Sequence, residues 1–236
     1  MGRSGDPDAR TGQAPDVAVL FDMDGLLIDS EPLWLEAERS VMTRLAPDSG
    51  WTESDQAALL GGSLNRTVSY LLAHATHPAP PEVVAEWLMG GICERVGRDG
   101  VPLRPGAREL LASVEAAGLP RALVTSSERR FMDTVLASTG MRFDVLVCAE
   151  DVSVTKPDPE PYLLAAKLLD VNPARCFALE DSPNGVASAQ AAGCRVFAVP
   201  SLVPIEAAPG LTVVRSLLEL GAGPAGLVVS TDPGGV

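Results

Sequence analysis

The chain has 236 residues, of which 46% are hydrophobic and 21% are charged. This composition is typical of a folded globular protein with one large domain, or with a core domain and a smaller second one. The formal net charge of −13 argues against nucleic acid as a partner, because phosphate backbones select basic surfaces. No apolar stretch reaches the length that spans a bilayer, so we expect no membrane partner.

The four cysteines are scattered and form no CxxC pair. Cys148, Cys176 and Cys194 lie in or beside apolar runs, where free cysteine behaves as a small buried hydrophobe. We therefore expect a reducing, cytoplasmic compartment.

The apolar run over residues 17–21 predicts a strand that is buried on both faces, and it leads directly into Asp22, Asp24 and Gly25. Open α/β proteins bind ligands at the carboxyl edge of such strands. Two carboxylates at that edge repel one another unless a cation or protons share the site. The arrangement indicates a metal-dependent reaction with an aspartate nucleophile. The alternative is a polar turn, since Asp and Gly are ordinary turn residues.

Residues 32–103 carry three apolar stripes at helical spacing, with no clear strand between them. We predict an inserted helical cap over the carboxyl edge of the sheet, which would exclude water and supply substrate contacts. The alternative is that these helices simply pack on the sheet. The stripes consist of Trp34, Ala37, Val41, Met42 and Leu45; of Leu64, Val68, Leu71 and Leu72; and of Val84, Trp87, Leu88, Ile92 and Val96.

From residue 104 onward, apolar runs of strand length alternate with amphipathic helical segments. This alternation is typical of right-handed βαβ units. We predict an α/β fold with a mostly parallel sheet, built from residues 16–31 and 104–222. The expected strands lie within residues 122–125, 145–149, 175–180 and 195–200, and the expected helices within 107–117, 129–138, 161–169 and 183–192.

The two ends of the chain differ from this core. Residues 1–15 contain no apolar segment, and residues 223–236 are rich in Gly and Pro. We expect a disordered N-terminal tail and a flexible C-terminal tail.

Polar residues follow two of the later strands. Thr125, Ser126 and Ser127 open a helix, and hydroxyls with free backbone N–H groups at a helix start favour an anion such as phosphate. The alternative is an N-cap. Lys156 precedes Pro157 in a loop that prolines stiffen. A lysine held there would neutralise a phosphate oxygen or a carboxylate, whereas an ordinary loop lysine is solvated.

Glu180 and Asp181 end another apolar run, and Ser182 and Pro183 then have the features of an N-cap and a first helical residue. Acidic residues at a helix start also complement the helix dipole. If these carboxylates instead face Asp22, they complete an oxygen site suited to Mg²⁺.

Four segments occur in order between about residues 17 and 200: FDMDGLLIDSE, VTSS, TKPDPEPY and LEDSPNGVASAQAAG. Together they resemble the four motifs of the haloacid dehalogenase-like superfamily, in particular its sugar-phosphate phosphatases and β-phosphoglucomutases. The resemblance implies a Rossmann-like core with a helical cap inserted after the first motif. It makes Asp22 the nucleophile, which takes the phosphoryl group as an aspartyl-phosphate. It makes Asp24 the residue that protonates the leaving alcohol and then activates water.

The resemblance also implies the cofactor, Mg²⁺. The Asp22 carboxylate, the Asp24 backbone carbonyl and Asp181 would hold the ion, with Glu180 a ligand or a partner of the ligands.

The phosphate group would be held by Thr125, the Ser126 backbone and Lys156. The expected partner is a small phosphorylated metabolite, a sugar or polyol phosphate. The sequence leaves the identity of the sugar and the oligomeric state open.

Two further activities are alternatives to a phosphatase. Asp24 argues against dehalogenation, which needs no second catalytic aspartate and no Mg²⁺. In the mutases, a GxSR segment of the cap supplies an arginine for a second phosphate. Here residues 61–66 read GGSLNR, so Leu64 stands at that position and Arg66 lies two residues further on, on a different side of a helix. A non-catalytic sugar-phosphate binding module is the third alternative, and it would not need Asp24 as an acid and base.

Overall fold

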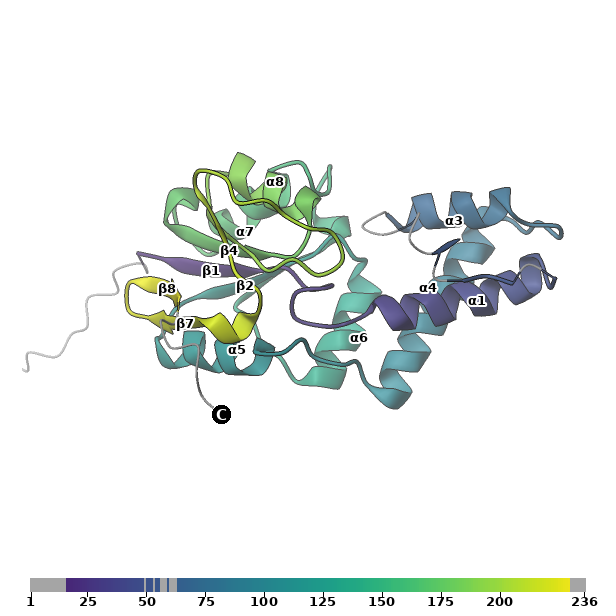
Figure 1. The fold of residues 1–236 in the computed structure, drawn as a ribbon, viewed down its shortest axis with the longest axis horizontal. Coiled ribbons are helices and arrows are strands. Elements are labelled where there is room, and N and C mark those ends of the chain that lie inside the picture. The colour runs from purple at the N-terminus through teal and green to yellow at the C-terminus, as the bar shows by residue number, and fades with distance from the viewer. Residues whose placement is uncertain (1–15, 49, 53, 56–58, 60–62, 230–236) are drawn as a thin grey trace, which may run out of the picture.

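The computed structural model describes residues 16–48, 50–52, 54–55, 59 and 63–229. Its centre is a six-stranded parallel sheet with the order β3-β2-β1-β4-β5-β6 (Figure 1). The direction of strand succession reverses between β1 and β4, and open α/β sheets bind ligands at this switch point. The predicted α/β fold with a parallel sheet is confirmed. The strands are β1 (Ala18–Phe21), β2 (Arg121–Val124), β3 (Val145–Val147), β4 (Cys176–Glu180), β5 (Arg195–Ala198) and β6 (Leu211–Val213).

Helices cover both faces of this sheet, with α5 and α6 on one side and α7 and α8 on the other (Figure 1). In β1, Val19 and Phe21 belong to the apolar cluster of the α5–α6 side, while Ala18 and Leu20 belong to that of the α7–α8 side. Because both faces are covered, a continuous apolar run forms the strand instead of an alternating one. The helices are α5 (Ala107–Ala116), α6 (Arg129–Thr139), α7 (Glu160–Leu168) and α8 (Pro183–Ala191).

Helices α1 (Glu31–Leu45), α3 (Leu64–Ala73) and α4 (Pro81–Asp99) are inserted between β1 and α5. They extend away from the edge of the sheet at which β1 ends (Figure 1). Within the insertion α1 and α3 pack against α4, and α4 in turn packs against α6 of the core. The segments that enter and leave the insertion run side by side, since the Asp29 N–H donates to the Pro102 carbonyl at 2.8 Å.

The chain after β5 differs from the prediction. A flexible tail was expected from residue 223, but β7 (Leu220–Gly223) and β8 (Gly226–Val229) form an antiparallel hairpin. The prediction is wrong as far as residue 229, because Leu220 and Leu227 are buried in the larger apolar cluster. The tails predicted for residues 1–15 and 230–236 lie outside the described residues.

Three short 3₁₀ turns complete the described elements: η1 (Ala149–Asp151), η2 (Pro173–Arg175) and η3 (Leu217–Glu219). No helix within the described ranges combines the length and the apolar character needed to cross a lipid bilayer.

Candidate active site

The pairing of β1 with β4 brings the first and last motifs together. Phe21 lies opposite Leu179 in the parallel register, so Asp22 and Glu180 follow at the same level of neighbouring strands. The Asp22 N–H donates to the Leu179 carbonyl at 3.1 Å. Two separate strand ends therefore deliver carboxyl groups to one point at the carboxyl edge of the sheet.

The Lys156 ammonium lies between two of these carboxylates. Its Nζ donates to Asp22 Oδ1 at 2.6 Å, to Glu180 Oε1 at 2.6 Å and to the Val124 carbonyl at 2.8 Å. All three donors of the ammonium are thus used. The side chain is only 5% exposed, which excludes the alternative of a solvated loop lysine. Burial by itself would lower the pKa of Lys156, but Asp22 and Glu180 outweigh that effect and raise the pKa, so the group stays charged.

Asp22, Glu180 and Asp181 form an acidic group whose ligand oxygens all lie within 4.8 Å of one another. Burial is the main cause that raises the pKa of each carboxyl, to about 7 for Glu180 and about 8 for Asp181. Three buried carboxyls share one ammonium, so full ionisation requires further positive charge.

Glu180 also supplies a test of whether a cation fits. Its Oε2 is buried and has no hydrogen-bond partner among the described residues. Leaving such an oxygen without a partner is destabilising. A hard cation that takes carboxylate oxygens, such as Mg²⁺, would provide both the missing partner and the missing charge. The acidic group therefore fits the predicted cofactor.

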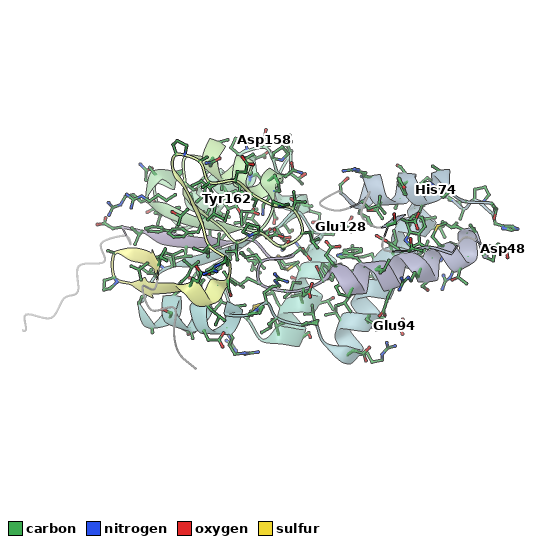
Figure 2. All side chains as sticks on the ribbon, in the orientation of Figure 1. Asp48, His74, Glu94, Glu128, Asp158 and Tyr162 are labelled. Atoms are coloured by element: carbon green, nitrogen blue, oxygen red, sulfur yellow. The ribbon has the colours of Figure 1, made fainter. Side chains whose placement is uncertain are left out.

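Two hydroxyl groups that the sequence did not identify hold the acidic pair. Tyr162 donates to Glu180 Oε1 at 2.5 Å, and Ser201 donates to Asp181 Oδ2 at 2.5 Å. Tyr162 lies on α7 beside the sheet (Figure 2), and Ser201 lies in the loop after β5. Burial, followed by the charge of Glu180, raises the pKa of Tyr162 well above its usual value, so the phenol remains a donor. Tyr162 belongs to the TKPDPEPY segment of Lys156, which was the available signal, whereas Ser201 has no local one.

Asp24 is held by hydroxyl groups. Ser30 donates to Asp24 Oδ1 at 2.6 Å, Ser127 donates to Oδ2 at 2.7 Å, and Thr125 donates to Oδ2 at 3.4 Å. Ser30 occupies the N-cap position of α1, but its side chain makes no capping bond there. Burial raises the pKa of Asp24 above its ordinary value, against the lowering effect of Ser30 and Ser127. A raised pKa favours the protonated form that a general acid needs.

Thr125 and Ser126, predicted to bind phosphate, lie directly after β2. Thr125 is buried and its hydroxyl accepts a hydrogen bond from the Ser127 N–H at 3.0 Å, while Ser126 is exposed. Neither residue caps the following helix, because the N-cap of α6 is Glu128 and no side chain makes a capping bond there. The N-cap interpretation of this segment is therefore wrong. Ser182, by contrast, does cap α8 and accepts from the Gly185 N–H at 3.1 Å.

Residues 61–66, the segment that the resemblance uses to distinguish mutases, lie partly outside the described residues, which do not include Gly61 and Gly62. Ser63 is the N-cap of α3 and accepts from the Arg66 N–H at 3.3 Å. Leu64 packs against the larger apolar cluster, and Arg66 is exposed.

Comparison with known proteins identifies the family. The family model of the haloacid dehalogenase-like hydrolases matches residues 19–199. The chain is 38% identical over 189 residues to hexitol phosphatase B of Escherichia coli K12, which covers 78% of this chain and 84% of that protein. It is 34% identical over 181 residues to hexitol phosphatase A of the same strain, and this match covers 76% of this chain and 81% of that protein. Among solved structures, a variant of CbbY from Rhodobacter sphaeroides in complex with xylulose-(1,5)-bisphosphate has a TM-score of 0.77 and 28% identity, and the match covers 86% of this chain and 96% of that one. The chain therefore belongs to the haloacid dehalogenase-like hydrolases, as its four motifs predicted.

Proposed function

We propose that this hydrolase is a Mg²⁺-dependent phosphatase of sugar or polyol phosphates that works through an aspartyl-phosphate. The class of phosphoric monoester hydrolases is supported by two relatives named hexitol phosphatases, and these names also favour a polyol phosphate. The single observation that carries the proposal is the convergence of Lys156 and Asp181 on Asp22, at the edge of the sheet where ligands bind.

The residues of the site account for both halves of the reaction. An Asp22 carboxylate oxygen attacks phosphorus, and the bond to the alcohol oxygen breaks as Asp24 donates its proton to that oxygen. Asp24, now a carboxylate, then accepts a proton from water, whose oxygen attacks phosphorus and releases Asp22. Lys156 holds Asp22 Oδ1 at 2.6 Å and so orients the nucleophile for in-line attack.

Asp22, Asp181 and the Asp24 backbone carbonyl would hold Mg²⁺, with Glu180 a ligand or a partner of the ligands. The bound cation supplies positive charge that offsets the repulsion between the phosphate and the anionic nucleophile. The other contacts to the phosphate oxygens would come from Thr125 and the Ser126 backbone. Lys156, whose three N–H groups are used by Asp22, Glu180 and Val124, would bind the phosphate through its positive charge.

The substrate is accordingly a small phosphorylated metabolite.

The four cysteines, three of them buried, are free thiols, which suits a reducing cytoplasmic compartment.

The test is phosphate release from p-nitrophenyl phosphate, followed by a panel of sugar, polyol and nucleotide monophosphates. We expect activity with Mg²⁺ that EDTA removes and that Asp22→Asn abolishes. Asp133→Asn is the matched control, because Asp133 is an exposed residue of α6, and it should keep full activity. Asp24→Asn should lower kcat by about 10²- to 10⁴-fold and change KM much less.

Two results would contradict the proposal. Conversion of β-glucose 1-phosphate to glucose 6-phosphate that outpaces hydrolysis would assign a mutase. Stabilisation by phosphorylated sugars without turnover of any phosphomonoester would assign a binding module.

A further inference from the structure

Tyr162 presents a hydroxyl group within an apolar layer. It is fully buried, and it packs in the smaller apolar cluster with residues such as Leu20, Val124 and Ala165. A hydroxyl in such surroundings is destabilising unless it is hydrogen-bonded. Its partner is Glu180 Oε1, at 2.5 Å. A phenylalanine would pack equally well in this layer. What the tyrosine adds is the hydrogen bond from its hydroxyl group to Glu180.

The two oxygens of Glu180 are in different environments. Oε1 accepts from both Tyr162 and Lys156, at 2.5 Å and 2.6 Å. Oε2 accepts from no described residue. The carboxylate also lies against the backbone of α8, where a Cβ on Gly185 would come within 1.8 Å of Oε2. The same Cβ would come within 2.2 Å of Oε1, so the α8 backbone confines the whole carboxylate, whereas the two side-chain donors bind Oε1 alone.

Lys156 depends on the same arrangement. Its Nζ lies 5.1 Å from the centre of the Tyr162 ring and uses its three donors on three acceptors, two of which are Asp22 and Glu180. Without the tyrosine hydroxyl, Glu180 Oε1 would retain Lys156 as its only donor. The carboxylate would then be free to turn and offer both oxygens to the ammonium.

We propose that Tyr162 is a positioning residue of the cation site and acts through Glu180. By donating to Oε1 beside Lys156, its hydroxyl leaves Oε2 as the oxygen available to a cation shared with Asp22 and Asp181. The inference rests on the proposed function for the identity of the cation as Mg²⁺. Loss of an outer partner of a metal ligand weakens metal binding by about 10- to 100-fold.

The test is Mg²⁺ binding to the full chain, measured by titration calorimetry without substrate. Tyr162→Phe should raise the Kd for Mg²⁺ by about 10-fold or more. Tyr70→Phe is the matched control, because Tyr70 is the other tyrosine of the chain and contacts Trp51 and His74 on the cap. It should leave the Kd unchanged. Because the defect is one of affinity, excess Mg²⁺ should restore much of the kcat of Tyr162→Phe, which it would not do for a misfolded enzyme.

A double-mutant cycle tests the route through Glu180. In a Glu180→Gln background, Tyr162→Phe should raise the Kd no further, since coupled residues are not additive. Fully additive losses would overturn the inference. An unchanged Kd in Tyr162→Phe, with normal Mg²⁺-dependent phosphatase activity, would overturn it and leave the proposed function standing. A wild-type chain that neither binds Mg²⁺ nor hydrolyses phosphomonoesters would overturn both.

Discussion

The Asp181 carboxylate lies against the backbone of Gly25, which follows the two aspartates of the first motif. Gly25 has a φ of +79°, and its N–H donates to the Ile28 carbonyl at 2.9 Å. A Cβ at this position would come within 2.0 Å of Asp181 Oδ2. Glycine therefore serves two purposes here: it adopts the left-handed turn, and it lets the Asp181 carboxylate approach the backbone of the first motif.

We expect Gly25→Ala to weaken Mg²⁺ binding on the order of 10-fold, because the new methyl group displaces Asp181. Gly118→Ala is the control for backbone strain, since Gly118 has a φ of +66° and no atom within 4 Å of its Cβ position. Both variants should lose about 1–2 kcal/mol of unfolding free energy from the left-handed backbone, as measured by urea unfolding. Equal Mg²⁺ affinities for the two variants in calorimetry would show that the close contact with Asp181 has no role in the site.

At the scale of elements, the β7–β8 hairpin supports β4, the strand that carries Glu180. Gly226 has a φ of +117°, and its Cβ position lies 2.0 Å from Cε2 of Phe177. Phe177 belongs to β4 and is 6% exposed. The hairpin therefore packs against the side chain of Phe177 on β4, the strand that ends at Glu180.

Gly226→Ala should lower the free energy of unfolding by about 2–3 kcal/mol, because the methyl group overpacks the core against Phe177 and because alanine is strained at the positive φ. Gly223→Ala, in the same hairpin, should change it by less than about 0.5 kcal/mol, since nothing lies within 4 Å of the Gly223 Cβ position. Urea unfolding of the two variants provides the comparison. Similar midpoints would mean that the hairpin does not stabilise the core.

At the scale of the whole molecule, the site concentrates acidic groups in a chain that already carries a net charge of −13. In the absence of a cation, burial raises the pKa of Glu180 to about 7 and that of Asp181 to about 8. Raised carboxyl pKa values mean that the folded chain binds more protons than the unfolded chain. Their contribution to stability is therefore complete only below the ordinary carboxyl pKa values of 4.5 and 3.8, and it is lost as the pH rises from there through about 7 and 8.

We expect Mg²⁺ to stabilise the protein more at alkaline than at acidic pH. At pH 6 the ion must displace protons from Glu180 and Asp181, whereas above about 8 both carboxyls are ionised. The measurement is the shift in urea midpoint between saturating Mg²⁺ and EDTA at pH 6 and at pH 8.5, with NaCl of equal ionic strength as the control for screening. A shift that is independent of pH would contradict the assignment of these carboxyls to the cation site.

Most of the core was predictable from local pattern. The strands β2 to β5 and the helices α5 to α8 follow from apolar period and length, since a strand covered on both faces must be apolar throughout. The edge strand β6 was not predicted. The hairpin at residues 220–229 was missed because its Gly and Pro content is typical of loops. Its burial depends on Leu220 and Leu227 reaching a core built from distant segments.

The sequence by itself determined the family, the parallel sheet and the candidate site residues Asp22, Asp24, Lys156 and Asp181, because these residues lie in three of the four short segments whose order and spacing are visible along the chain. Only the tertiary structure decided which groups hold them. Lys156 reaches Asp22 across 134 residues, and Thr125 reaches Asp24 across 101. The donors Tyr162, Ser201 and Ser30 take part because strand register and helix packing bring their hydroxyls within hydrogen-bond distance. No local pattern encodes a hydrogen bond between side chains as far apart as Lys156 and Asp22 or Thr125 and Asp24, since it arises when separate strand ends meet at one edge of a sheet.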